Sequence, residues 1–428
     1  MRQRGLLPLL ACLLGVGCAH PGLPSVLRSD WPESVRSALD RGAYDEVEAG
    51  VRQLEASGQP VLASLVRVIS AAQAHDPAAM RAALERPETQ ALRGDPTLRS
   101  ALAQAIAGVL GLAAAAPDFQ AICADPSAHP TDHQDACAGA ALAALGPPAS
   151  TSGDAGAELA FLPKLPIPIV IGALSGVEGA PLIIDTGAAG TALSKAFCES
   201  HHLPYLADKP QRSEDAGGAP VALWPMRLAS LQVGGYLREG LPAVVIELPP
   251  NLKVGAILAP QRSFEGSLVE LDFRQNRLRI LREQRIEDWV KEVAEPVHQA
   301  ALAWDGGNIF VRARIDDRLE GWMNFDSGAA GSILTLEAVE RLGRTVDKSA
   351  ASVSTSIEKH AAFPPFSAEL QLGDGPADAV QLTPIERRPT VRALRPIGNL
   401  GVPWMRGRRI ALAPDGRSIW YTAAHVGP

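Results

Sequence analysis

Two aspartates in nearly identical surroundings are the residues of this sequence best suited to chemistry. Asp185 lies in the segment 182–194, LIIDTGAAGTALS, and Asp326 lies in the segment 324–335, NFDSGAAGSILT. Each aspartate follows a short apolar run and precedes a hydroxyl residue, a glycine and further small residues. One such tripeptide is weak evidence, because it also occurs in ordinary turns and helix caps. Its recurrence 141 residues later is much stronger evidence.

If the fold brings the two aspartates together, they form an acid–base pair. Two carboxyl groups about 3 Å apart cannot both ionise, so they share one proton and their apparent pKa values separate. The ionised member can activate a water molecule, while the protonated member polarises a peptide carbonyl group. Gly187 and Gly328 allow a tight turn that brings backbone close to the carboxylates. Thr186 and Ser327 are placed to hydrogen-bond across to the opposite copy.

The duplication extends well beyond the two aspartate motifs. Four further landmarks repeat: two strand-like runs joined by a turn (168–171 with 180–184, and 308–315 with 321–325), the match of 229–234 to 368–373, the match of 224–225 to 363–364, and the match of 276–277 to 416–417. The offset stays between 139 and 141 residues throughout. An almost constant offset predicts one domain fold used twice in the same chain.

These motifs resemble the active turns of the aspartic proteases. Alanine follows glycine in both copies, which is similar to the retroviral (retropepsin-like) branch of this family. Two lobes in a single chain are instead similar to pepsin. The resemblance covers roughly residues 162–422. It implies that Asp185 and Asp326 are catalytic, that Thr186, Gly187, Ser327 and Gly328 support them, and that the substrate is a peptide or protein. No metal or organic cofactor is expected, because water is the nucleophile.

The resemblance implies two further elements. A glycine-tipped hairpin at Gly217 and Gly218 would form the flap that closes over substrate, although an ordinary surface hairpin has the same pattern. A hydrophobic-hydrophobic-glycine element should thread beneath each active turn. The chain departs from that element at Ala259 in lobe one and at Asn399 in lobe two. These departures keep an alternative open, in which a catalytically impaired protein binds peptides or builds an envelope scaffold.

The sequence predicts a multidomain α plus all-β protein. An α-helical domain of helical hairpins is expected at 29–145, because alanine-rich sequence there carries apolar residues at helical spacing. The expected divisions that follow are a linker at 146–157, lobe 1 at 158–285, a connector helix at 286–303 and lobe 2 at 304–428. The two lobes are expected to be tandem retropepsin-like β units that form a pepsin-like pseudo-dimer. A protein partner for the helical domain is a further possibility.

The N-terminus has the features of an export signal. Residues 1–17 contain two arginines followed by an apolar run, and this run is too short to span a bilayer. Residues 18–28 would form a tether. The run that ends at Cys18 resembles a bacterial lipobox and predicts lipidation of that cysteine, whereas simple cleavage near Ala19 is the alternative. The expected location is therefore the cell envelope, on a membrane that faces the periplasm or the exterior.

Cys123, His129, His133 and Cys137 form the second cluster of chemistry-bearing residues. Two thiolates and two imidazoles at this spacing could bind zinc. In an exported protein, a Cys123–Cys137 disulfide that closes a loop between two helices is the favoured interpretation. The formal net charge of −7, without a basic cluster, gives no reason to expect a nucleic-acid partner.

Overall fold

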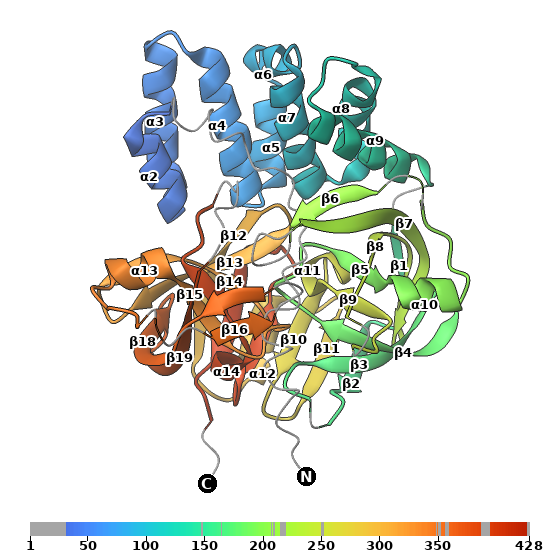
Figure 1. Ribbon diagram of the computed structural model, residues 1–428, viewed down its shortest axis with the longest axis vertical. Coiled ribbons are helices and arrows are strands. Elements are labelled where there is room, and N and C mark those ends of the chain that lie inside the picture. Colours follow the sequence, from blue (N-terminus) through green and yellow to red (C-terminus); the bar gives the residue numbers. More distant parts are fainter. Residues whose placement is uncertain are drawn as a thin grey trace.

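The computed structural model describes residues 31–425, except 147–148, 164, 207, 209, 215–219, 250–251, 348, 350–351, 356–358 and 387–393. The predicted order, a helical region followed by β domains, is confirmed. Figure 1 shows the helices as one layer against the β region, which forms two lobes. The predicted signal peptide, the tether and Cys18 lie outside the described residues, as do Gly217 and Gly218.

The described helical layer contains eight helices. They are α2 (Glu33–Arg41), α3 (Tyr44–Ala56), α4 (Pro60–Gln73), α5 (Pro77–Leu84), α6 (Pro87–Leu92), α7 (Pro96–Leu110), α8 (Leu112–Ala124) and α9 (Pro130–Ala144). The Asp-Pro pairs start helices as expected, because Asp76 Oδ1 accepts from the backbone N–H groups of Ala78 and Ala79 at 2.9 and 3.0 Å. Consecutive helices pack on each other around a shared apolar core.

Lobe one contains most strands of the first half of the β region. Its elements are β3 (Ile169–Leu174), β4 (Val177–Ile184), β5 (Thr191–Ser194), α10 (Lys195–Ser200), β6 (Gln211–Glu214), β7 (Pro220–Val233), β8 (Tyr236–Ile246), β9 (Ala256–Leu258), α11 (Pro260–Ser263), β10 (Leu268–Asp272) and β11 (Arg277–Leu281). Two of its pairings are parallel: β4 with β9, and β5 with β8. They bring the end of β4, and therefore Asp185, into the middle of the sheet.

Lobe two repeats these pairings in its own strands. Its elements are β13 (Asn308–Ile315), β14 (Leu319–Phe325), β15 (Ser332–Thr335), α13 (Leu336–Arg341), β16 (Ser352–Thr355), β17 (Lys359–Ala362), β18 (Phe366–Leu372), β19 (Asp378–Ile385), β20 (Gly398–Leu400), α14 (Val402–Met405), β21 (Arg409–Leu412) and β22 (Ser418–Thr422). The parallel pairs are β14 with β20 and β15 with β19. Asp326 therefore follows β14 in the same way that Asp185 follows β4.

Six neighbouring strands of a 14-stranded sheet join the two lobes. Their order is β2-β11-β10-β21-β22-β12, and the central pair, β10 with β21, crosses from one lobe to the other. The outer strands are β2 (Gly156–Ala160) and β12 (Val297–Asp305). Each half of the chain therefore contributes three strands, and the lobes share an apolar core.

The expected linker at 146–157 is not an unstructured connection. The strand β1 (Ser150–Gly153) pairs with β8, and β2 pairs with β11. Three of the four residues of β1 are exposed. Backbone hydrogen bonds hold an exposed edge strand in its sheet, so such a strand does not need alternating apolar residues. The small polar residues of β1 therefore show no strand pattern in the sequence.

The connector helix is also shorter than expected. The helix α12 spans only Ile286–Glu292, and β12 begins at Val297. Proline at 296 disfavours a helical conformation in the residue before it. The backbone that follows pairs instead with β22, from Val297 with Thr422 to Ala301 with Ser418. The charged pattern of 286–303 did not reveal this pairing, because its partner lies more than a hundred residues away.

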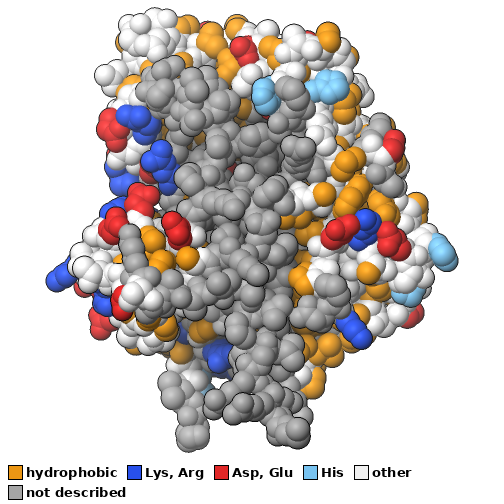
Figure 2. Space-filling model, in the orientation of Figure 1, with side chains coloured by type: hydrophobic (Ala, Val, Ile, Leu, Met, Phe, Trp, Pro, Cys, Tyr) orange, Lys and Arg blue, Asp and Glu red, His pale blue; other side chains and the backbone are white. Residues whose placement is uncertain are grey.

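The helical layer contacts both lobes. The ring of His75 stacks on that of Trp304 at a centroid distance of 4.1 Å, and Arg262 Nη2 donates to the carbonyl oxygen of Gly108 at 2.8 Å. Arg312 Nη1 donates to the carbonyl oxygen of Arg41 at 2.9 Å. On the face shown in Figure 2, basic and acidic side chains lie close to each other rather than in separate regions.

Candidate active site

The two aspartates occupy equivalent turns directly after β4 and β14. Their side chains are buried, with 0% and 1% of their surface exposed for Asp185 and Asp326. The backbone N–H of Asp185 donates to the carbonyl oxygen of Leu258 at 2.8 Å, and that of Asp326 donates to Leu400 at 3.0 Å. The strands β9 and β20 therefore lie beside the turns. The departures at Ala259 and Asn399 leave these backbone hydrogen bonds in place.

The hydroxyl groups of Thr186 and Ser327 join the two turns reciprocally. Thr186 Oγ1 donates to the carbonyl oxygen of Phe325 at 2.6 Å and accepts from the backbone N–H of Ser327 at 2.9 Å. Ser327 Oγ donates to the carbonyl oxygen of Ile184 at 2.8 Å and accepts from the N–H of Thr186 at 3.0 Å. Four buried backbone groups are satisfied by two side chains, and the relative position of the two lobes is fixed at this point.

The glycines of the two motifs allow each turn to approach the opposite aspartate. A Cβ atom at Gly187 would lie 2.4 Å from Cγ of Asp326, and one at Gly328 would lie 2.5 Å from Cγ of Asp185. Both distances are shorter than real carbon contacts, so a larger residue would push the two carboxyl groups apart. The expected juxtaposition of the aspartates is therefore present, and each carboxyl group affects the pKa of the other.

Burial raises the pKa values of both carboxyl groups. Desolvation is the largest cause for each, and the charge of Asp326 raises the pKa of Asp185 further. The backbone N–H of Gly187 opposes this shift by donating to Asp185 Oδ1 at 2.8 Å. Asp185 Oδ2 and Asp326 Oδ1 have no hydrogen-bond donor among the described residues. These two oxygen atoms are available to hold a proton between them or to bind a water molecule.

Asn399 makes the pair asymmetric, which the sequence did not predict. Its Nδ2 donates to Asp326 Oδ2 at 2.6 Å. This hydrogen bond lowers the pKa of Asp326 against the effect of burial. Asn399 pairs in register with Asn324, and the equivalent pair in lobe one is Ile257 with Ile183. Among the described residues, Asp326 alone receives a side-chain amide donor, so the proton of the pair is favoured on Asp185.

Two more polar side chains support the first turn. Gln261 Nε2 donates to the carbonyl oxygen of Ala188 at 2.7 Å, and Asn308 Nδ2 donates to that of Gly187. Gln261 comes from α11 of lobe one, whereas Asn308 starts β13 of lobe two. Neither residue belongs to a recognisable motif, so the sequence analysis did not select them. The one signal in the sequence was that each is a polar residue next to an apolar segment that occurs in both lobes.

The flap segment is described only at its two sides. The strands β6 and β7 pair antiparallel from Gln211 with Leu223 to Glu214 with Pro220. Gly217 and Gly218, the predicted tip, lie outside the described residues. In lobe two, β16 and β17 pair from Ser352 with Ala362 to Thr355 with Lys359.

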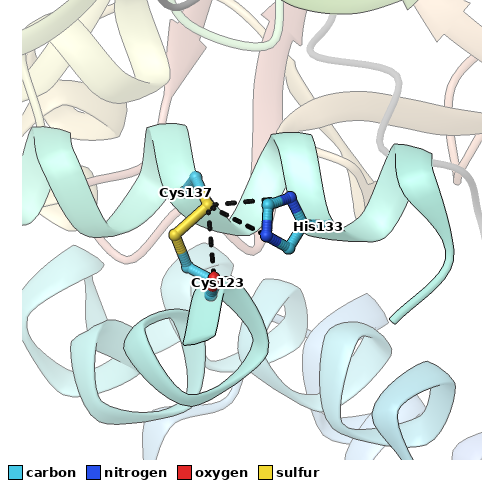
Figure 3. A group of neighbouring side chains, drawn as sticks. All are labelled: Cys123, His133 and Cys137. Atoms are coloured by element: carbon cyan, nitrogen blue, oxygen red, sulfur yellow. Dashed lines mark hydrogen bonds between the residues drawn. A yellow bond between two sulfur atoms is a disulfide. The ribbon is translucent and has the colours of Figure 1, made fainter. Parts of the chain in front are cut away.

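Cys123 and Cys137 are joined by a disulfide that ties α8 to α9 (Figure 3). His133 lies on the same side of α9, with Nε2 3.8 Å from Cys137 Sγ. Sulfur atoms bonded to each other do not supply the thiolates that a zinc site needs.

Cys198 is a buried free thiol whose pKa is raised by burial to about 11. Among the described helices, none combines the length and the apolar character that crossing a membrane requires.

Two β lobes that share a sheet, each contributing one aspartate to a buried pair, have the features of an aspartyl protease-like protein. Comparison with family models supports this class, because residues 170–262, which include Asp185, match the model described as aspartyl protease. No curated protein matches the chain.

Solved structures with some similarity include a retropepsin-like aspartic protease from Rickettsia conorii, with 18% identity and a TM-score of 0.22 over 31% of this chain and 94% of that chain. Basic 7S globulin from soybean has 8% identity and a TM-score of 0.37 over 65% and 98% of the two chains. At these values, neither comparison carries a conclusion about activity.

Proposed function

We propose that this protein is an aspartic-type endopeptidase, in which two lobes arranged as a pepsin-like pseudo-dimer supply one aspartate each. The observation that carries the proposal is the reciprocal hydrogen bonding of Thr186 and Ser327, which holds Asp185 and Asp326 together. Burying two carboxyl groups side by side costs folding free energy. That cost is explained if the pair carries out acid–base chemistry.

In the proposed reaction, Asp326 is the base and Asp185 is the acid. A water molecule between the two carboxyl groups loses a proton to Asp326 while its oxygen bonds to the carbonyl carbon of the substrate. Asp185 gives its proton to the carbonyl oxygen, and a gem-diol forms. Transfer of the proton on Asp326 to the amide nitrogen then allows the C–N bond to break, and Asp185 regains a proton from the collapsing diol. Protons and electron pairs balance without a metal or organic cofactor.

The competing proposal, a catalytically impaired peptide-binding protein or envelope scaffold, rests on Ala259, Asn399 and the large helical domain. Ala259 still follows Leu258, which accepts from the N–H of Asp185. Asn399 donates to Asp326 and favours its ionised form. Both departures are therefore compatible with a working pair.

The decisive experiment is digestion of a peptide library by the purified protein, with products identified by mass spectrometry. The Asp185→Asn variant, prepared in the same way, controls for contaminating proteases. The proposal expects cleavage products from the wild type that are missing with the variant. Equal product patterns, or no products over a broad range of pH, would favour the scaffold.

We also propose that the chain is exported and anchored to a membrane by a lipid on Cys18. The support is the basic and apolar sequence that ends at this cysteine. A Cys18→Ser variant should move from the membrane fraction to the soluble envelope fraction. If the wild type is already soluble and has an unmodified mature N-terminus, the anchor is rejected.

A further inference from the structure

A cavity of about 580 Å³ lies between the helical layer and the β region. One wall is apolar and comes from the helices, where Leu65, Val68, Ile69, Leu110, Leu112 and Phe119 line it. The opposite wall comes from lobe one and the start of lobe two, and it includes Arg227, Arg238 and Arg262. The volume is within the range of small-ligand sites, and the two walls call for a ligand with an apolar body and an anionic group.

Several residues that line this cavity have buried polar atoms without a partner among the described residues. Gln73 is 2% exposed, yet both Nε2 and Oε1 of its side chain are unpaired. His75 Nδ1, Arg238 Nε and Arg227 Nη2 are unpaired as well. Each buried unpaired group costs about 1–3 kcal/mol. Four such residues around one cavity indicate that a polar ligand satisfies them.

Arg227 supplies the charge that the ligand must neutralise. Arg238 is already paired with Glu265 at 3.0 Å, and Arg262 donates to the carbonyl oxygen of Gly108. Arg227 makes no hydrogen bond or ion pair with any described residue, and desolvation lowers its pKa. A guanidinium group nevertheless stays protonated in proteins. An anion in the cavity, such as a carboxylate, would compensate it.

Gln73 distinguishes a peptide from a fatty acid. Its Oε1 atom needs a hydrogen-bond donor, and its Nε2 atom needs an acceptor. The carboxylate of a fatty acid offers acceptors only, whereas a peptide group offers one N–H and one carbonyl group. We therefore propose that the cavity binds the carboxyl-terminal residues of a peptide, with the terminal carboxylate at Arg227, a peptide group at Gln73 and apolar side chains against the helices.

The cavity adjoins the first active turn, so this inference rests on the proposed function and names the part of the substrate that binds here. Ala189 and Gly190 line the cavity and follow Asp185 by four and five positions. Gly307 lines it too, and a Cβ atom at Gly307 would lie 2.5 Å from the carbonyl oxygen of Ala189. If the substrate leaves the aspartate pair along this turn, its carboxyl end lies in the cavity and is recognised by the helical layer.

The test measures binding to the full chain carrying Asp185→Asn, so that no hydrolysis is required. The probes are a fluorescent hexapeptide that ends in Val-Leu-Phe with a free carboxylate, the same peptide with a terminal amide, and dodecanoate as a competitor. The free acid should bind about tenfold or more tightly than the amide, because the amide leaves Arg227 without an anion. Dodecanoate should compete only weakly.

Variants then assign the contacts. Arg227→Met should abolish the preference for the free acid, whereas Arg285→Met, at an exposed arginine outside the cavity, should leave it unchanged. Gln73→Leu should weaken both peptides about equally. The inference is overturned if the Asp185→Asn protein, with Arg227 and Gln73 intact, binds the free acid and the amide with equal affinity. It is also overturned if dodecanoate binds tightly and the Gln73→Leu substitution does not change that binding. Binding of the free-acid peptide as expected, together with no cleavage products from the peptide library, would overturn the endopeptidase proposal alone.

Discussion

Asn399 donates a hydrogen bond of 2.6 Å from Nδ2 to Asp326 Oδ2, and the residue at the equivalent place beside Asp185 is Ile257. The two halves of the site therefore have the same backbone arrangement but different electrostatics. Ionisation is favoured on Asp326 by the amide donor and disfavoured on Asp185 by the neighbouring charge. In the proposed reaction, this difference makes Asp326 the base and Asp185 the acid.

Replacing Asn399 by isoleucine should shift the acidic limb of the kcat/KM profile to higher pH. The base must be ionised, and loss of the donor raises the pKa of Asp326. A hydrogen bond to a charged group is worth about 1.5–3 kcal/mol, which corresponds to about 1–2 pH units. Ile257→Val serves as the control in lobe one and should leave the limb in place. An unchanged limb in Asn399→Ile would show that Asn399 does not set the ionisation of Asp326.

Thr186→Val should destabilise the protein by about 2–4 kcal/mol and abolish most activity. The variant keeps the shape of the side chain but leaves the N–H of Ser327 and the carbonyl oxygen of Phe325 unpaired in a buried site. Denaturant unfolding gives the free energy, and peptide hydrolysis gives the activity. Thr186→Ser retains the hydroxyl group and should recover most of both. If valine and serine behave alike, the hydroxyl group does not join the lobes.

Asp185→Asn should stabilise the protein increasingly as the pH rises above about 4. The pKa of Asp185 is raised in the folded state, so its proton is kept there while the unfolded chain releases it. The wild type therefore loses stability between the unfolded-state and folded-state pKa values, by about 1.4 kcal/mol for each pH unit that separates them. Melting temperatures should agree near pH 4 and diverge above it. A difference that does not depend on pH contradicts the raised pKa, and exposed Asp317→Asn is the control.

Removing the Cys123–Cys137 disulfide should lower stability by about 3 kcal/mol, because it closes a short loop between α8 and α9. The paired Cys123→Ala and Cys137→Ala variant tests this by denaturant unfolding. A chelator such as EDTA should leave the melting temperature of the oxidised protein unchanged. If EDTA lowers it, these residues bind a metal ion instead.

The sequence predicted the repeated features of the fold well. The constant offset between the two motifs anticipated that the apolar run before each aspartate forms an equivalent strand, β4 and β14, since each run is a local pattern that occurs twice. The Asp-Pro pairs at Asp76 and Asp95 also marked helix starts, because a cap is a local feature.

The features that depend on distant contacts were not predictable from one sequence. Asn399 was interpreted as a departure from an apolar element, because its hydrogen bond to Asp326 spans 73 residues. The strand β1 has no apolar alternation, and β12 has a partner from the end of the chain. Gln73 and Arg227 come from different domains, and only the packing of the helical layer on lobe one places them in the same cavity.

Hydrolysis by a shared-proton pair requires both aspartates. The direct measurement is kcat/KM for the best library peptide with the wild type, Asp185→Asn and Asp326→Asn, each shown to be folded by its melting curve. We expect either substitution to lower kcat/KM by about a thousandfold or more, because each carboxyl group has its own step in proton transfer. If either variant retains a substantial part of the wild-type rate, the paired mechanism is contradicted.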